Sequence, residues 1–309
     1  MSDTGPLVDL FSAAGFQPPP LAEAAHLVAY GHTLASLKSL PGIRIEAAAT
    51  PDGLVAEILV DAGVRAAPPL HLCLGLHRGL ALQNVRLTIT LQPDAEITVL
   101  SHCLFSTPQA ARHAMDADIH LMEGAILHHQ EAHHHGPSGS IEVLPRARVM
   151  LDKGARYLSD FSLVQGRVGW LDIDYTVAVG EDALAELVSR VYGWGSDRIR
   201  IVERLSLDGA GARGLVKSRV AVRDDAQAEV RGVMAGNAAG ARGHVDCMEI
   251  VRDRATVSAV PEVRVRHPLA KVTHEAAIGS VDSHQLETLM ARGLAPDAAV
   301  DLIVRGMLA

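Results

Sequence analysis

Short runs of alternating apolar and polar residues, separated by Gly, Asp and Asn, fill the chain from about residue 43 to residue 280. Clear examples are residues 43–46, 85–91, 199–202 and 263–265. Because successive side chains of a β-strand point to opposite faces, this period predicts many half-buried strands joined by tight turns. Residues 182–187 look the most helical in this region, but we expect them also to be strand and turn. The chain should therefore be mainly β.

Three architectures could hold so many strands: a sandwich, a propeller and a solenoid. No Trp-Asp or kelch-like blade signature recurs, which argues against a propeller. Aromatic residues make up only 3% of the chain, and small residues and glycines crowd residues 205–247. That composition suits a thin interior between stacked coils about 4.8 Å apart. The pattern therefore favours a parallel β-helix over residues 43–280.

The two ends of the chain have helical sequence patterns, unlike its middle. Residues 1–42 are predicted as an N-terminal helical segment, which Pro41 and Gly42 end. Its apolar residues recur at three- and four-residue spacing, at Leu21, Ala24, Ala25, Val28, His32 and Ala35.

Residues 281–309 are predicted as a C-terminal helical hairpin. Asp282 or Ser283 can cap a helix over residues 284–292, and Gly293 supplies the left-handed stop. Pro296 then suits the first turn of a second helix. That second helix is apolar along one stripe, so we expect another surface to cover it.

Composition and charge exclude several classes of protein. A net charge of -8, a pI near 6.0 and the absence of a Lys/Arg run argue against nucleic acid as a partner. Three distant cysteines argue against a disulfide framework. No long uncharged apolar run and no basic, apolar leader is visible, so we expect a cytoplasmic protein that has no membrane span and whose thiols are reduced.

Cys247, His274 and Glu275 form the principal candidate site. A thiolate, an imidazole and a carboxylate can together hold iron, zinc or an iron–sulfur cluster. The 28 residues from Cys247 to Glu275 are close to one turn of a β-helix, so these residues could lie on neighbouring coils. On a strand, Val245, Cys247 and Glu249 would share one face. The alternative is that Cys247 is a small core residue, and that one of His274 and Glu275 faces solvent while a backbone group satisfies the other.

A second candidate is a histidine cluster, because eight of the 16 histidines lie between His102 and His135. Short His-rich tracts can bind transition metals through neutral imidazole. The possible ligands are His128, His129, His133, His134 and His135. The alternative is a polar, solvent-facing turn with its tip at Gly136 and Pro137.

Familiar catalytic motifs are missing from the sequence. It contains no G-x-x-x-x-G-K-[ST], no G-x-S-x-G, no H-E-x-x-H and no C-x-x-C. The glycine-rich residues 209–214 lack a following helix, so we interpret them as a turn between strands. The sequence therefore gives no support for these classes of catalytic site.

The string HVDCMEIV from residue 244 and the string THEAAIGSVDSHQLETLMARGL from residue 273 resemble the SufB/SufD family of iron–sulfur cluster assembly proteins. The resemblance is close over about 65 residues and looser from about residue 90 onward. It implies a right-handed parallel β-helix followed by helices that dock on SufC, an ABC-type ATPase. It also implies that Cys247 is a cluster-building cysteine, that Glu275 matches a SufB-type glutamate and that His274 matches a SufD-type histidine. The docking residues it implies are Gln285, Leu286, Leu289, Arg292, Leu302 and Ile303.

The resemblance implies a scaffold that is not itself an enzyme, on which a transient iron–sulfur cluster forms while a SufC-like ATPase hydrolyses ATP in trans. The cluster type stays open. The chain is shorter than SufB and SufD usually are, so it could pair with itself or with a SufB/SufD paralogue, and it would pass its cluster to acceptor proteins. Two alternatives stay open: a SufD-like structural partner without its own cluster, and a metal-dependent enzyme or His-rich metal-binding module that uses the histidine cluster.

Overall fold

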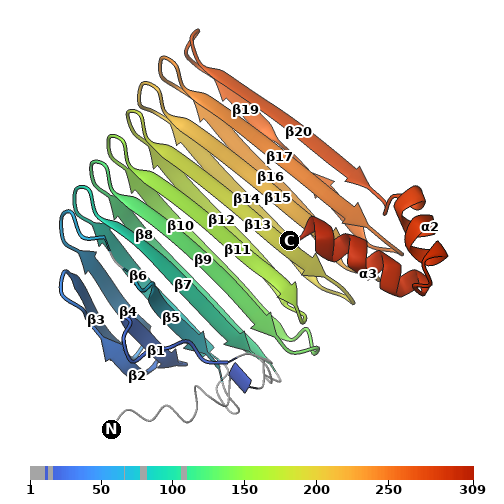
Figure 1. Ribbon diagram of the computed structural model, residues 1–309, viewed down its shortest axis with the longest axis horizontal. Coiled ribbons are helices and arrows are strands. Elements are labelled where there is room, and N and C mark those ends of the chain that lie inside the picture. Colours follow the sequence, from blue (N-terminus) through green and yellow to red (C-terminus); the bar gives the residue numbers. More distant parts are fainter. Residues whose placement is uncertain (1–10, 13–16, 66, 77–81, 106–109) are drawn as a thin grey trace.

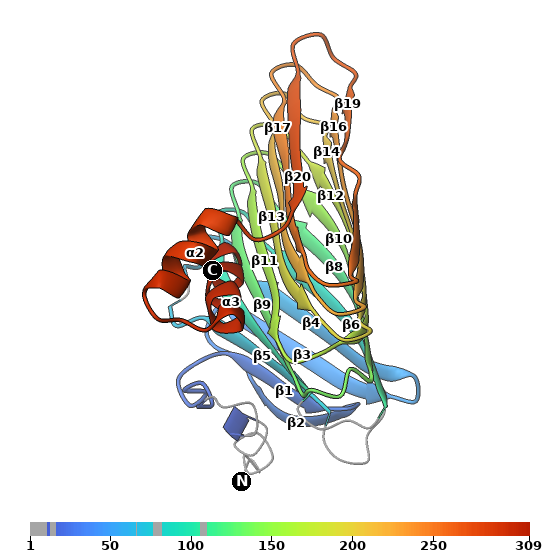
Figure 2. The same cartoon turned by 90° about the vertical axis from the view of Figure 1, so that its right-hand side faces the viewer.

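The computed structural model describes residues 11–12, 17–65, 67–76, 82–105 and 110–309, which form two facing sheets in a tapering stack of coils (Figures 1 and 2). Sheet A runs in the order β2 (Thr33–Lys38), β1 (His26–Tyr30), β5 (Leu70–Gly75), β7 (Glu96–Phe105), β9 (Ile126–His135), β11 (Arg156–Gln165), β13 (Leu184–Gly193), β15 (Arg213–Val222), β17 (Arg242–Val251) and β20 (Lys271–Gly279). Sheet B runs in the order β18 (Thr256–Ala259), β16 (Gln227–Gly236), β14 (Arg198–Leu207), β12 (Gly169–Val179), β10 (Ile141–Leu151), β8 (Ala111–Leu121), β6 (Leu82–Leu91), β4 (Gly53–Val60) and β3 (Ile43–Thr50), with β19 (Glu262–Val265) also paired to β16.

The chain alternates between the two sheets, and successive strands of one sheet pair in parallel about one coil apart. Glu96 of β7, for example, is the register partner of Ile126 of β9. Every second side chain is buried between the sheets, as in β8, so the interior is one long apolar core. The prediction of a mainly β, parallel β-helix is confirmed, and residues 182–187 enter β13 as expected.

The corners of the coils explain the Gly and Asp residues that separate the sequence runs. Asp94, Gly124, Gly154 and Asp182 occupy equivalent corners with φ between 54° and 69°, in the left-handed region. Each donates its backbone N–H to a carbonyl of the next coil, as Gly124 does to Lys153 at 2.9 Å. Gly and Asp tolerate this conformation better than most residues, so the Gly and Asp residues between the strand runs determine where the corners form.

The predicted helix over the N-terminal segment is wrong for residues 26–38. Residues His26–Tyr30 and Thr33–Lys38 form the antiparallel strands β1 and β2, and β1 also pairs in parallel with β5. All five residues of β1 are buried, and a fully buried strand gives an unbroken apolar run that helical spacing also fits. Residues 1–10 and 13–16 of the predicted helical segment lie outside the described part of the chain.

The C-terminal helical hairpin is present as α2 (Ser283–Ala291) and α3 (Pro296–Met307). Asp282 caps α2 by accepting the N–H of Gln285 at 2.7 Å, and Gly293 has a φ of 94°. The two helices lie against the outer face of sheet A (Figure 2).

The apolar stripe of α3 is covered by another surface, as we expected. Val300, Val304 and Leu308 pack against Ala221 of β15. The covering surface is the chain's own sheet A.

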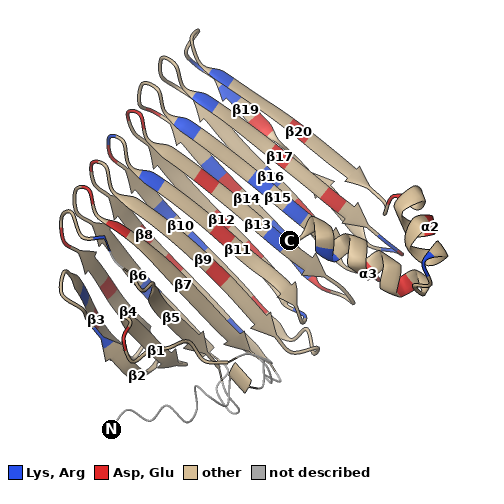
Figure 3. Ribbon diagram, viewed as in Figure 1, with Lys and Arg blue, Asp and Glu red and all other residues tan. Residues whose placement is uncertain are grey.

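Charged side chains on the outer faces pair between neighbouring coils, which spreads blue and red segments across the ribbon in Figure 3. Arg148 contacts Asp118 at 2.8 Å and Arg200 contacts Asp172 at 2.7 Å, in each case about one coil apart. Surface pairs of this kind add little stability individually, but they favour the observed register. No helix in the described residues is long and apolar enough to cross a membrane.

Candidate functional site

Cys247 and the pair His274–Glu275 lie on adjacent strands, β17 and β20, as the one-coil spacing predicted. In the parallel register, Cys247 is opposite Ala276, Val245 is opposite His274, and Asp246 is opposite Glu275. Because faces alternate along a strand, His274 shares the inner face with Cys247, whereas Glu275 falls on the outer face. The backbone therefore brings the cysteine and the histidine to one face but places the carboxylate on the other.

The Cys247 side chain lies in a small polar region of the core. The residue is 1% exposed, and Val245 and Glu249 share its buried face as expected. Burial raises the pKa of the Cys247 thiol to about 11. The thiol is therefore protonated in this conformation.

Two buried carboxyl groups accompany this thiol. Burial raises the pKa of Glu249 to about 7 and that of Glu203, on β14, to about 7. Ser218 donates to Glu249 at 3.4 Å and Ser189 donates to Glu203 at 2.6 Å. The second carboxyl oxygen of Glu249 is buried without a hydrogen-bond partner in the described structure. Such groups carry a desolvation cost and are common where a protein binds or moves charge.

Strand β20 is the last strand of sheet A, so one of its edges has no partner strand among the described residues. Eight of its nine residues are exposed, including His274 and Glu275, and Ile278 is 51% exposed. An exposed strand edge is a template for pairing with another chain. The predicted cluster residues on β20 thus lie on the most accessible strand of the solenoid.

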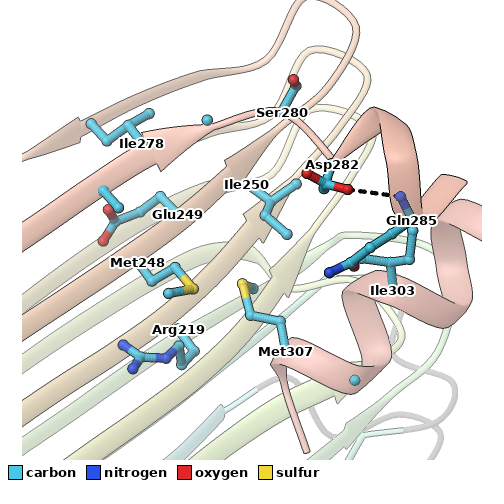
Figure 4. Close-up of a pocket in the computed structure, with 13 residues that line it drawn as sticks. Arg219, Met248, Glu249, Ile250, Ile278, Ser280, Asp282, Gln285, Ile303 and Met307 are labelled. Carbon is cyan, nitrogen blue, oxygen red and sulfur yellow. Dashed lines mark hydrogen bonds between the residues drawn. The ribbon is translucent and has the colours of Figure 1, made fainter.

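A groove of about 610 Å³ separates the ends of β17 and β20 from the two helices (Figure 4). Arg219, Met248 and Glu249 line its sheet side, while Gln285 and Ile303 line its helix side. Glu249 is among the residues that line this groove, and it belongs to the buried face of β17 that also carries Cys247. The groove thus lies beside the strand of the candidate cluster site.

The predicted docking residues divide between packed and exposed positions. Leu286 packs in the small core between α3 and sheet A, and Leu289 is half-buried. Arg292 and Leu302 are exposed, Leu302 by 50%. Only part of this set is therefore available to a second protein.

The histidine-rich segment is strand β9 and not a solvent-facing turn, so that alternative is wrong. His129, His133 and His135 point inward and are buried, whereas His128 and His134 fall on the outer face and are half-buried. A turn does follow at Gly136 and Pro137. The five predicted ligands therefore cannot act as one set, because they face opposite sides of the sheet.

Three residues that we did not predict from the sequence lie beside the inward-pointing histidines: Cys103, Glu131 and His113. The ligand atoms of Cys103 on β7, Glu131 and His133 all lie within 4.8 Å of one another, and all three residues are buried. His113 of β8 approaches from sheet B, with its Nε2 4.0 Å from the Cys103 Sγ. The alternate-residue pattern His129-x-Glu131-x-His133 on a predicted strand was a usable signal for Glu131.

Burial disfavours the charged forms of the side chains in this second cluster. It lowers the pKa of His113 to about 3 and that of His133 to about 3, raises the pKa of Glu131, and raises the pKa of Cys103 well above its usual value. Aliphatic side chains fill most of the interior, so a buried group of Cys, Glu and His side chains is unusual there.

Residues 76–307, most of the solenoid together with both helices, match the model of the SUF-system iron–sulfur cluster assembly SufBD core domain. The chain belongs to the SufBD family. It is 38% identical over 267 residues to an iron–sulfur cluster assembly SufBD family protein of Methanocaldococcus jannaschii, covering 86% of this chain and 84% of that protein. A relative from Pyrococcus horikoshii is 33% identical over 284 residues, with coverage of 92% and 86%.

SufBD membership supports a role in iron–sulfur cluster assembly. The coverage of the two relatives allows their lengths to be compared with that of this chain. Because 84% and 86% of their sequences align with this one, its length is close to theirs. The match to a relative from Methanothermobacter thermautotrophicus covers only 60% of that protein.

Proposed function

We propose that this SufBD protein is a non-catalytic scaffold on which a transient iron–sulfur cluster forms at strands β17 and β20. Cys247 supplies the thiolate and His274 a further ligand, and Glu275, which lies on the outer face of β20, joins them when the strands shift. The observation that carries the proposal is the pairing of β17 with β20. His274 is opposite Val245, which is the inward-facing residue next to Cys247 on β17, and β20 is the edge strand of sheet A. Thiolate and imidazole ligands suit iron–sulfur clusters.

Two copies of the chain complete the site in this proposal. The free edge of β20 pairs with its counterpart across a two-fold axis, which brings two Cys247 residues towards one cluster. A symmetric pair satisfies the unpaired backbone groups and covers Ile278 at the same time. A SufB/SufD paralogue with a similar edge would serve equally well as the second copy.

A SufC-like ABC ATPase is the proposed partner at the helices. Cys247 is only 1% exposed, so a cluster can form there only after the strands shift. The helices α2 and α3 contact sheet A close to the groove beside Glu249, so ATP-driven movement of the helices reaches β17 directly. The ATPase binds the exposed residues of the hairpin, including Arg292 and Leu302.

Anaerobic reconstitution with iron and sulfide tests this function. We expect visible sulfur-to-iron charge-transfer absorbance in the wild type and its loss in Cys247→Ser. The matched control is Cys73→Ser, because Cys73 is buried in a separate cluster with Phe11 and Leu104. Unchanged absorbance in Cys247→Ser would rule out the site.

One observation favours a second function, that of a SufD-like structural partner without its own cluster. The Cys247 thiol is buried and protonated, and its direct neighbour on β20 is Ala276. In that case the chain would bind the ATPase and a paralogue, and wild type and Cys247→Ser would both stay colourless in the reconstitution.

A further inference from the structure

A compact group of metal-ligating side chains lies inside the solenoid, far from the site at β17. Cys103 of β7 and His133 of β9 are direct register partners, and Glu131 lies two residues before His133 on the same inner face. His113 projects from β8 in the opposite sheet, with its Nε2 4.0 Å from the Cys103 Sγ. Strands β11, β13 and β15 separate this group from β17.

Hydrogen bonds fix which nitrogen of His113 faces the cysteine. The Gln83 side-chain nitrogen donates to the carbonyl of Gly31 at 2.9 Å, which orients the amide. The Gln83 oxygen therefore faces His113 Nδ1 at 2.9 Å and accepts its proton. Neutral imidazole carries only one ring proton, so His113 presents the lone pair of Nε2 to Cys103.

A second chain of hydrogen bonds does the same for His133. The carbonyl of Arg167 accepts from His135 Nδ1 at 3.2 Å, which leaves His135 Nε2 as an acceptor. That atom lies 3.3 Å from His133 Nδ1, which therefore carries the proton of His133. The lone pair of His133 Nε2 consequently points at Glu131, 2.7 Å away.

We propose that Cys103, Glu131, His133 and His113 bind one divalent transition ion of the zinc or ferrous class inside the solenoid. One sulfur, two imidazole nitrogens and one carboxylate oxygen form a four-ligand set that such ions favour. Gln83 and His135 hold the two imidazoles in the ligating tautomer, as partners of metal-bound histidines commonly do. Tyr175 donates to the other oxygen of Glu131 at 3.4 Å and so orients the carboxylate.

The charges and protons balance. The thiol of Cys103 and the carboxyl of Glu131 each release a proton to solvent, and their two negative charges neutralise the ion. The imidazoles release none, because the Nε2 atoms of His113 and His133 already carry lone pairs, which face Cys103 and Glu131. The contact between Glu131 and His133 lengthens as the ion enters between them.

The test is the metal content of the full-length protein expressed with added zinc or iron, in the Cys247→Ser background so that any cluster at β17 is absent. We expect about one ion per chain and no acid-labile sulfide. Cys103→Ala and His133→Gln should each reduce that content at least roughly tenfold, whereas Cys73→Ser should retain it. Cobalt loading should give a thiolate-to-cobalt absorption band that Cys103→Ala removes.

Gln83→Met provides a second variant that keeps all four ligands but removes the acceptor of His113. We expect it to fold and to bind the ion roughly 10–100-fold more weakly. Failure of the background protein to take up a stoichiometric ion overturns the proposal, as does uptake that is equal in Cys103→Ala, His133→Gln and Gln83→Met. Neither result affects the cluster proposal, which rests on Cys247.

Discussion

Cys247 of β17 and Ala276 of β20 are register partners at the last step of sheet A. The cysteine therefore has a small, non-ligating neighbour beside it, and His274 lies one inward position away. One chain therefore does not supply a complete ligand set beside the buried thiol. In the function we propose, a second chain at the edge of β20 supplies the rest, so the site belongs to an interface and not to a single coil.

The edge of β20 should control assembly. Ile278→Lys places a charge on this exposed strand, and charged residues on an edge prevent strand pairing. We expect the wild type to be a dimer by light scattering after size exclusion, and Ile278→Lys to be a monomer. The control is Met150→Lys, which is 50% exposed on β10. A monomeric wild type, or a dimeric Ile278→Lys, would contradict the edge-pairing model.

The α2–α3 hairpin should carry the ATPase contact on its exposed residues. Leu302 is 50% exposed although it belongs to a helix that packs on sheet A, so Leu302→Asp leaves the packed stripe intact. We expect this variant to bind the SufC-like ATPase at least roughly tenfold more weakly in calorimetry, with unchanged melting temperature. Met150→Asp, on the other sheet, should bind normally. Equal affinity of the two variants would remove Leu302 from the interface.

The buried carboxyl of Glu203 should make stability depend on pH. Burial raises its folded-state pKa from 4.5 to about 7, so the folded chain retains a proton that the unfolded chain loses. The free energy of unfolding should therefore fall as pH rises from 4.5 to 7, by up to about 3 kcal/mol from this group. Other groups titrate in this range as well, so the informative quantity is the difference between the wild type and Glu203→Gln.

Urea denaturation below pH 4.5 and above pH 7 measures that difference. Glu203→Gln can still accept from Ser189, so its cost at low pH should be small. Relative to the wild type, the variant should gain stability at the higher pH. The same difference at both pH values would show that Glu203 titrates normally in the fold.

Much of the architecture could be predicted because strand periodicity and corner residues act locally. The run entering β13 and the Asp94 and Gly124 corners carry their own signals. The N-terminal segment could not be assigned this way, because all of β1 is buried and its apolar run also fits a helix. The hairpin turn between Tyr30 and Thr33, where Gly31 has a φ of 54°, was the overlooked signal.

The sites depend on which residues the stacking brings together. Cys247 and His274 could be related because one coil length separates them along a single sheet. His113 and Cys103 are only ten residues apart, but they lie on opposite sheets, and their approach depends on where the chain crosses between them. The sequence also cannot show that α3 folds back onto Ala221, because that contact joins residues about 80 positions apart.

Anaerobic native mass spectrometry after reconstitution tests the central claim most directly, because it counts chains and clusters in one species. We expect two chains with one bound iron–sulfur cluster for the wild type and for Cys73→Ser, and two chains without a cluster for Cys247→Ser. A cluster that remains on Cys247→Ser, or one that is bound to a single wild-type chain, would contradict a cluster site shared across β20.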